Sequence, residues 1–255
     1  MSQRTGENQV TVYGRRAVLE ALATSTVTVE QAAVAKECPA DFRAELGRAC
    51  RARSIEPRTL PLAEIGALTG DPRNDQGVAA LVRLKEVTEI ESFTESLTGP
   101  RAAAPTRVVA LDNITNPQNV GMVIRSAAAA GVSAMLWPRA GMPWVNGLVI
   151  KASAATVYRL PIVRCHTLPE GLFSLKRAGF TLFGLVAGAG ESLFDAAPPH
   201  RACFVIGGEV SGISNEVLDL LDRRVSIPMA PGVESLNAAV AAAFVCYAAS
   251  GLLSS

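Results

Sequence analysis

The sequence predicts an α/β protein in which a small α/β unit precedes a larger unit built on a mostly parallel sheet. Three observations lead to this prediction. In the second part of the chain, apolar runs of strand length alternate with runs at helical spacing, as in sheets covered by helices on both faces. A polar stretch separates this part from the first. The chain has 255 residues, 49% of them hydrophobic, which is enough for a sizeable core.

The polar stretch is predicted to be a linker between two domains. It starts with acidic residues, then carries Gly99, Pro100 and Pro105, and holds few apolar residues. The predicted parts are a small α/β domain at 1–84, a linker at 85–106 and a larger domain at 107–255.

In the first domain, three elements are predicted. Apolar residues recur at helical spacing in YGRRAVLEAL and in DFRAELGRACRAR, whose arginine-rich side is expected to face solvent. GVAALVRL is expected to be a closing strand. These elements cover residues 13–22, 41–53 and 77–84.

In the second domain, strands and helices are predicted in alternation. The expected strands cover residues 107–114, 133–138, 159–165, 180–187, 201–208 and 223–229. The expected helices are one that follows Pro117 and is stopped by Gly131, then 146–158, 168–179 and 214–222, followed by a last helix from Ala238. The polar loops DNITNPQN, GAGE, GGEVSG and APGVES all follow strands. Because ligands of parallel sheets bind beyond the carboxyl ends of strands, these loops can form one site.

Composition excludes several classes of protein. A net charge of +1 does not indicate a nucleic-acid partner, although the many arginines suit phosphate recognition. The five cysteines form no C-x-x-C pair, so buried, reduced thiols are expected in place of a disulfide framework or a zinc site. The first residues are polar and the apolar run Ala238–Ala249 is too short to span a membrane, so a cytoplasmic protein is predicted.

Common catalytic and nucleotide-binding motifs are missing. A G-x-G-x-x-G motif starting at Gly188 would need glycine at the position of Leu193, so the dinucleotide fingerprint fails. No P-loop, H-E-x-x-H or G-x-S-x-G motif occurs. His166 and His200 are expected to be surface residues without a catalytic role.

Three other stretches carry polar residues that a plain core does not need. In NPQNVGMVIRSAAAAG, Arg125 lies on an otherwise apolar helix, so it either pairs with a carboxylate such as Glu209 or Glu234 or binds an anionic ligand. In FVIGGEVSGIS, glycines let a ligand approach the backbone beside Glu209. In IPMAPGVESLNAAV, the polar Ser235 and Asn237 precede a run of small residues.

Together, these stretches resemble the motifs of the SpoU family of S-adenosylmethionine-dependent RNA ribose 2′-O-methyltransferases, in the SPOUT superfamily. The first motif is matched by Asn119, Gly121, Arg125, Ser126 and Ala127, the second by Gly207, Glu209, Gly212 and Ile213, and the third by Ile227, Pro228, Met229, Glu234, Ser235, Leu236 and Asn237. This resemblance covers about residues 107–255. The first domain is similar to the RNA substrate-binding domain of ribosomal-RNA members.

The resemblance implies a SPOUT-type parallel sheet whose C-terminal part forms a deep trefoil knot. S-adenosylmethionine would lie bent in the knot, and no metal would be needed because the sulfonium is already an activated methyl donor. The positions implied for cofactor binding are Gly207, Ile227 and Leu236, with Met229 and Ala187 as neighbours.

The resemblance also implies a homodimer that methylates structured RNA, with 23S-type ribosomal RNA as the expected substrate and tRNA as the alternative. Arg125 would handle the 2′ proton together with the RNA phosphate. Asn119, Glu209, Ser235 and Asn237 would orient Arg125, the ribose or the cofactor.

Two departures and two rival functions stay open. Val210 stands where many members have glycine, and Pro231–Gly232 changes the third loop. These departures leave room for a catalytically impaired RNA-binding member of the fold. The α/β alternation alone would also fit a nucleotide-dependent oxidoreductase, against which the failed glycine fingerprint argues.

Overall fold

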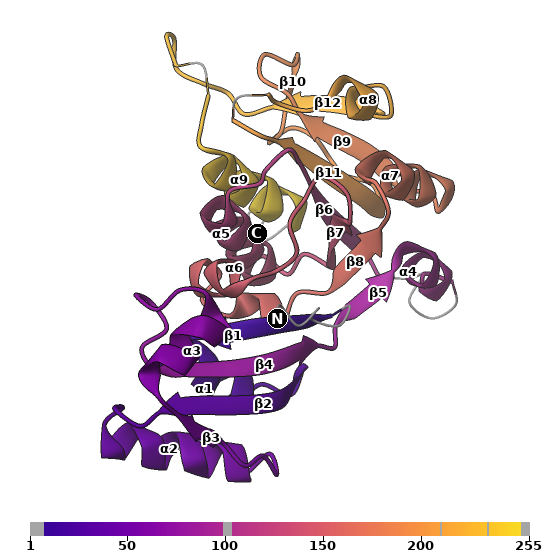
Figure 1. Ribbon diagram of the computed structural model, residues 1–255. Coiled ribbons are helices and arrows are strands. Elements are labelled where there is room, and N and C mark those ends of the chain that lie inside the picture. The colour runs from indigo at the N-terminus through magenta and orange to yellow at the C-terminus, as the bar shows by residue number, and fades with distance from the viewer. Residues whose placement is uncertain (1–7, 99–103, 210, 234, 251–255) are drawn as a thin grey trace. The chain divides into compact units, whose positions relative to one another are not determined.

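The structure is a computed structural model that describes residues 8–98, 104–209, 211–233 and 235–250. The chain divides into two compact units (Figure 1). The first consists of Met1–Glu86 and Val145–Arg159, and the second of Val87–Trp144 and Leu160–Ser255. One segment from the middle of the second predicted domain therefore belongs to the first unit.

The first unit is built on a four-stranded sheet in the order β1–β4–β2–β3 within the described residues. β4 runs antiparallel to β1 and β2, and β3 runs parallel to β2. The strands are β1 (Gln9–Tyr13), β2 (Val27–Ala35), β3 (Arg58–Leu60) and β4 (Val78–Leu84). The helices are α1 (Arg15–Ala23), α2 (Ala40–Arg51), α3 (Leu62–Thr69) and α6 (Gly147–Ala152).

The predicted helices α1 and α2 and the predicted strand β4 are confirmed. β2 is absent from the prediction because a bulge between Val29 and Gln31 breaks the alternation of its buried residues. α6 packs on β1. This approach depends on Gly147, where a β-carbon would lie 2.0 Å from Cε1 of Tyr13.

The second unit contains an eight-stranded sheet, in the order β10–β12–β9–β11–β6–β7–β8–β5. Every neighbouring pair that the described residues form is parallel, so the predicted parallel sheet is confirmed. The strands are β5 (Val87–Glu89), β6 (Thr106–Asp112), β7 (Ala134–Pro138), β8 (Ile162–Cys165), β9 (Thr181–Leu185), β10 (Glu191–Ser192), β11 (Arg201–Gly207) and β12 (Arg223–Ser226).

Helices cover both faces of this sheet (Figure 1). On one face, α5 (Pro117–Ala129) packs against α9 (Ala238–Ser250), which also contacts β6 and β11. On the other face, α4 (Ile90–Ser96) and α7 (Leu168–Arg177) lie over the strands, and the short α8 (Asn215–Leu218) packs against α7. Apolar side chains of α7 and of the central strands form the core on that face.

Four predicted elements differ from the structure. The helix predicted at 146–158 ends at Ala152, and a separate 3₁₀ turn covers Thr156–Tyr158. The segment predicted as a linker holds β5 and α4, because Ile90 and Leu97 are buried in the core of the second unit. The helix predicted at 214–222 is only one turn long. The strand predicted at 223–229 ends at Ser226, and the residues after it form a loop.

Candidate functional site

A cavity of about 460 Å³ lies at the carboxyl ends of three neighbouring strands, β9, β11 and β12. The loop after each of these strands contributes to its wall, and so does the start of α9. Ligands of open parallel sheets bind at this edge. Three of the four loops predicted to converge thus line one hollow in the second unit, and the loop DNITNPQN contributes no residue to its wall.

All five residues that the resemblance marks for cofactor binding line this cavity. They are Ala187, Gly207, Ile227, Met229 and Leu236. They come from loops far apart in the sequence, and the strand order brings them together. Their binding role itself stays a prediction.

The end of β11 is fixed by a close crossing of the chain. A β-carbon on Gly207 would lie 2.3 Å from the carbonyl carbon of Gly212 and 2.4 Å from the nitrogen of Ile213, so only glycine fits. The N–H of Gly208 donates to the carbonyl of Asp112 at 2.9 Å, and the N–H of Gly212 donates to the carbonyl of Gly208 at 2.8 Å. The loop beside the cavity is therefore held by its own backbone.

Glu209 gathers hydrogen-bond donors from two other parts of the chain. Its Oε1 accepts from Asn119 Nδ2 at 3.1 Å, from Asn237 Nδ2 at 2.5 Å and from the N–H of Ala238 at 3.1 Å. Asn237 Nδ2 also reaches Asn119 Oδ1 at 3.3 Å. Asn119, Glu209 and Asn237 thus form one cluster, the Glu209 cluster, and Glu209 itself lines the cavity together with Ser235.

Helix capping holds two members of this cluster in place. Asn237 Oδ1 accepts from the N–H groups of Ala239 and Val240, at 3.0 and 3.4 Å, so the side chain that contacts Glu209 also caps α9. Asn116 caps α5 in the same way, with Pro117 at the first helical position. This cap fixes the start of the helix that carries Asn119.

Arg125 lies outside the cluster. Its side chain is exposed on α5 and, within the described part of the chain, makes no hydrogen bond or ion pair. It is not paired with Glu209, whose bonded oxygen is occupied by the two asparagines and a backbone N–H. Glu234, the other partner considered, and Val210 lie outside the described residues.

Other kinds of site find no support in the described residues. All five cysteines are buried and free, and burial raises the pKa of the Cys165 and Cys246 thiols to about 12, so neither is a thiolate near neutral pH. Within the described ranges, no group of three or more His, Cys, Asp or Glu residues could hold a metal ion. Nor does any described helix have the length and apolarity that a membrane span requires.

Asp112, the first residue of the predicted loop DNITNPQN, is not among the individual site residues that the sequence prediction names. It is only 8% exposed, and its Oδ2 accepts from the N–H of Ser214 at 2.6 Å, which ties the end of β6 to the chain that crosses β11. The signal was present in the sequence, because an aspartate directly follows the apolar run VVAL. Gly208 also lines the cavity without having been selected, and so does Pro228, which the third motif contains but which was given no role.

Comparison with known protein families identifies the family to which the chain belongs. A model of the SpoU rRNA Methylase family matches residues 106–247. The chain belongs to the SpoU family. A second model, described as RNA 2′-O ribose methyltransferase substrate binding, matches residues 11–88.

Individual SpoU relatives resemble the chain over most of its length. An "Uncharacterized tRNA/rRNA methyltransferase" of Mycobacterium avium is 33% identical, over 96% of this chain and 77% of that protein. The "23S rRNA (guanosine-2'-O-)-methyltransferase RlmB" of Xanthomonas axonopodis is 34% identical, over 77% of this chain and 78% of that protein. The solved structure of the SpoU methyltransferase AviRb from Streptomyces viridochromogenes with AdoMet has a TM-score of 0.75 and 25% identity, covering 100% of this chain and 94% of AviRb.

The protein is therefore a SpoU-family RNA 2′-O-methyltransferase that uses S-adenosylmethionine. Its cavity fits such a cofactor, because ligand pockets measure about 300–1,000 Å³ and combine apolar walls with a few polar groups. Main chain at Gly207 and Gly208 and apolar side chains after β12 supply this combination. At Gly188, which lines the cavity, a β-carbon would meet no atom within 4 Å, so the wall is open there.

Proposed function

We propose that this SpoU-family enzyme methylates a ribose 2′-oxygen in 23S-type ribosomal RNA. The name of the Xanthomonas relative and the substrate-binding model on residues 11–88 support this substrate. The observation that carries the proposal is the position of the Glu209 cluster, which joins α5 and α9 to the wall of the cavity. A cytoplasmic location is part of this proposal, because ribosomal RNA is the proposed substrate.

S-adenosylmethionine, when bound, supplies a methyl group already activated by its positively charged sulfur. We assign its binding to main-chain groups at Ala187 and Gly207 and to the side chains of Ile227, Met229 and Leu236. Apolar side chains would exclude water, while backbone N–H and C=O groups would fix orientation. The residues of this chain then have to align the attacking ribose oxygen and accommodate the proton that it loses.

Arg125 is proposed to interact with negative charge on the RNA phosphate and on the attacking ribose oxygen. A guanidinium is protonated at neutral pH and has no acceptor, so Arg125 binds the RNA phosphate, which takes up the 2′ proton, and stabilises the oxygen as negative charge develops. Ser235 and the Glu209 cluster would position the ribose at the edge of the cavity. In this assignment Arg125 is the catalytic residue, and Asn119, Glu209 and Asn237 support it.

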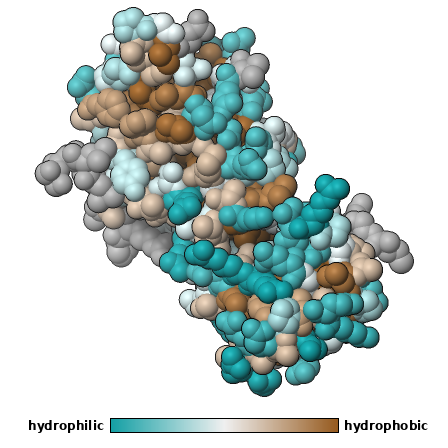
Figure 2. Space-filling view, turned by 90° about the vertical axis from the view of Figure 1, so that its left-hand side faces the viewer, coloured by the Kyte–Doolittle hydropathy of each residue, from teal (hydrophilic) through white to brown (hydrophobic). Residues whose placement is uncertain are grey.

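A homodimer would place Arg125 at an interface. Exposed apolar residues gather on and beside α5 and α9, and Figure 2 shows hydrophobic side chains on this side of the second unit. They are Met122, Phe194, Val240 and Phe244, exposed by 41%, 50%, 47% and 41%. We name them the α5–α9 surface. Because Arg125 follows Met122 by one helical turn, pairing through this surface would carry the arginine to the partner subunit.

The deep trefoil knot is part of the same proposal. Membership of the SpoU family supports this part of the proposal, whereas the contact of Gly207 with Gly212 and Ile213 is a turn between residues five and six positions apart. The presence of the knot would explain why the loops after β9, β11 and β12 meet around one cavity.

The test is a methyl-transfer assay with the full chain. Total RNA from a strain lacking this gene is incubated with labelled S-adenosylmethionine, and the 2′-O-methyl positions are mapped. We expect label at a defined ribose of 23S-type RNA. Label in tRNA alone would overturn the ribosomal substrate, and the absence of label from all RNA would indicate a catalytically impaired member of the family.

The Arg125→Ala variant tests the catalytic assignment in the same assay. Loss of one group that stabilises developing charge lowers kcat by about 10²–10³-fold. Affinity for S-adenosylmethionine should stay close to that of the unmodified enzyme, because Arg125 does not line the cavity. Arg177→Ala, which removes an exposed arginine of α7, is the matched control. Undiminished turnover by Arg125→Ala would contradict the assignment.

A further inference from the structure

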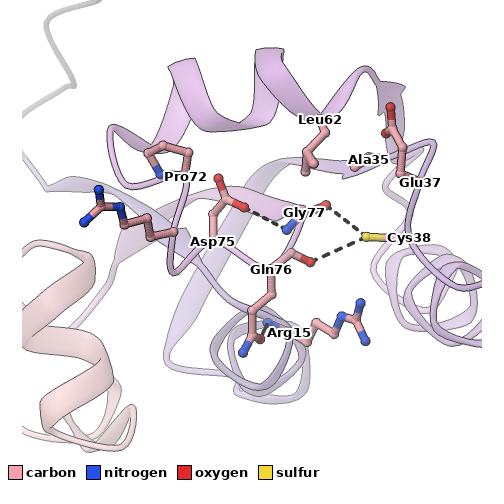
Figure 3. Close-up of a pocket in the computed structure, with 10 residues that line it drawn as sticks. Arg15, Ala35, Glu37, Cys38, Leu62, Pro72, Asp75, Gln76 and Gly77 are labelled. Atoms are coloured by element: carbon pink, nitrogen blue, oxygen red, sulfur yellow. Dashed lines mark hydrogen bonds between the residues drawn. The ribbon is translucent and has the colours of Figure 1, made fainter.

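A second cavity, of about 520 Å³, lies entirely within the first unit (Figure 3). Its wall includes Arg15 at the start of α1, Glu37 and Cys38 after β2, Leu62 of α3, and Gln76 and Gly77 before β4. We name it the Gln76 recess. The reaction proposed above gives it no role.

The loop that forms one wall of the recess is held rigidly. Asp75 is only 1% exposed, and its carboxylate accepts from the N–H of Gly77 at 2.8 Å and from the hydroxyl of Thr69 at 3.1 Å. Asp71, at the start of the loop, accepts from the hydroxyl of Tyr13 at 3.1 Å. Such a loop presents its remaining groups in one arrangement.

Gln76 is held in a conformation that side chains rarely adopt. Its φ is 54°, in the left-handed region, and backbone strain of this kind is found often at binding sites. Its Oε1 accepts from the N–H of Arg15 at 2.9 Å. The amide NH₂ group has no partner among the described residues, so it remains a donor at the wall of the recess.

Arg15 brings further donors to the same cavity. Its guanidinium lies over the ring of Phe42, 4.9 Å from the centroid, which holds the side chain in place. Its Nε is buried and has no hydrogen-bond partner among the described residues. Leu62, 47% exposed, adds an apolar surface. In Figure 3, Arg15 and Glu37 lie on either side of Cys38, so donors and an acceptor both border the recess.

We propose that the Gln76 recess binds one unstacked nucleotide of the RNA substrate, with the base against Leu62 and the backbone at Gly77. The donors of Arg15 and Gln76 contact acceptors on the base edge or its phosphate, and Glu37 accepts from the base. Proteins that read RNA sequence do so mainly on unpaired bases, through arginine planes, apolar contacts and edge hydrogen bonds. This inference rests on the proposed function, because it takes the bound partner of the first unit to be RNA.

The test measures binding of a labelled, unstructured RNA decamer of mixed sequence to the full chain, by fluorescence anisotropy at several salt concentrations. Gln76→Gly removes the amide and suits the left-handed backbone, so the fold should be preserved. We expect about fivefold weaker binding from the lost hydrogen bond, with an unchanged salt slope. Arg15→Ala should bind about tenfold more weakly, and the slope should fall by about 0.7 if a phosphate contact is lost.

Arg48→Ala, which removes an exposed arginine of α2 outside the recess, is the control and should bind nearly as the unmodified chain does. Three results would overturn the proposal: no binding of the decamer, equal binding by Gln76→Gly, or equal binding of an abasic decamer, which would show a phosphate site alone. If the unmodified chain transfers methyl groups but Gln76→Gly does not change decamer binding, the proposed role of the recess is refuted and the proposed reaction is not. If Gln76→Gly weakens decamer binding but the unmodified chain transfers no methyl group, the proposed reaction is contradicted and the role of the recess is not.

Discussion

Glu209 joins three separate stretches of the chain through a single carboxylate oxygen, which accepts from Asn119, Asn237 and the N–H of Ala238. Hydrogen bonds to an ionised acceptor are about twice as strong as neutral ones. The negative charge therefore holds two asparagines in one orientation at the edge of the cavity. We therefore propose that Glu209 positions these side chains and makes no contact with the transferred methyl group.

The variant Glu209→Gln tests this role. An amide keeps the shape and one acceptor oxygen, but it loses the negative charge that strengthens the three hydrogen bonds to that oxygen. We expect kcat/KM for methyl transfer to fall about tenfold to a hundredfold, the equivalent of roughly 1.5–3 kcal/mol for hydrogen bonds to a charged group. Glu216→Gln, at an exposed glutamate of α8, should leave kcat/KM unchanged. Equal activity of the two variants would show that the cluster is not needed.

At the scale of elements, the end of β11 is the least adaptable point of the site. Gly207→Ala would place a β-carbon 2.3 Å from the backbone of Gly212, and a backbone cannot rotate away as a side chain can. We expect the free energy of unfolding to fall by about 3 kcal/mol. In contrast, Gly190→Ala meets no atom within 4 Å and should change the free energy of unfolding little. Urea unfolding of both variants checks this, and similar stabilities would contradict the crossing at Gly207.

The alternation of strands and helices could be predicted because buried parallel strands are short apolar runs and α5 and α7 are amphipathic. β2 could not, because its bulge hides the period of two residues. The membership of α6 in the first unit could not either. It depends on Gly147 lying against the ring of Tyr13, a contact between residues more than a hundred positions apart that no local pattern records.

More of the candidate site was predicted than strand and helix patterns alone could indicate, because the family motifs name individual residues. Family motifs selected the residues that line the cavity, and strand order places them together. Motifs did not indicate that Glu209 binds Asn119 and Asn237 while Arg125 stays exposed. The Gln76 recess escaped prediction for a related reason, because its main signs are a positive φ and a buried Nε, which are properties of three-dimensional structure.

At the scale of the whole molecule, the α5–α9 surface is expected to pair two chains. Fully burying a phenylalanine contributes about 1.5–3 kcal/mol, and an introduced carboxylate would oppose that burial. Phe244→Glu should therefore convert a dimer to a monomer in analytical ultracentrifugation and lower methyl transfer. Phe173→Glu, at an exposed residue of α7, is the control and should remain dimeric. A monomeric unmodified chain would refute the pairing.

The first unit cannot be removed by a single N-terminal deletion, because it also contains a segment from later in the chain. Val149, Ile150 and Tyr158 are at most 2% exposed, and the segment that carries them, Val145–Arg159, belongs to the first unit. Tyr158 also accepts a hydrogen bond at its carbonyl from the hydroxyl of Thr26. A deletion that stops at the predicted domain boundary would leave this segment without its sheet.

Deletion of residues 1–86 should therefore impair the second unit as well as RNA binding. Exposing several large side chains, at about 1.5–3 kcal/mol each, costs on the order of 5–10 kcal/mol, which is comparable to the whole stability of a domain at about 5–15 kcal/mol. We expect aggregation on gel filtration and weak S-adenosylmethionine binding in calorimetry. A second deletion that also replaces residues 145–159 with a short polar linker should restore both. If the simple deletion is monodisperse and binds the cofactor normally, the segment is not an integral part of the first unit.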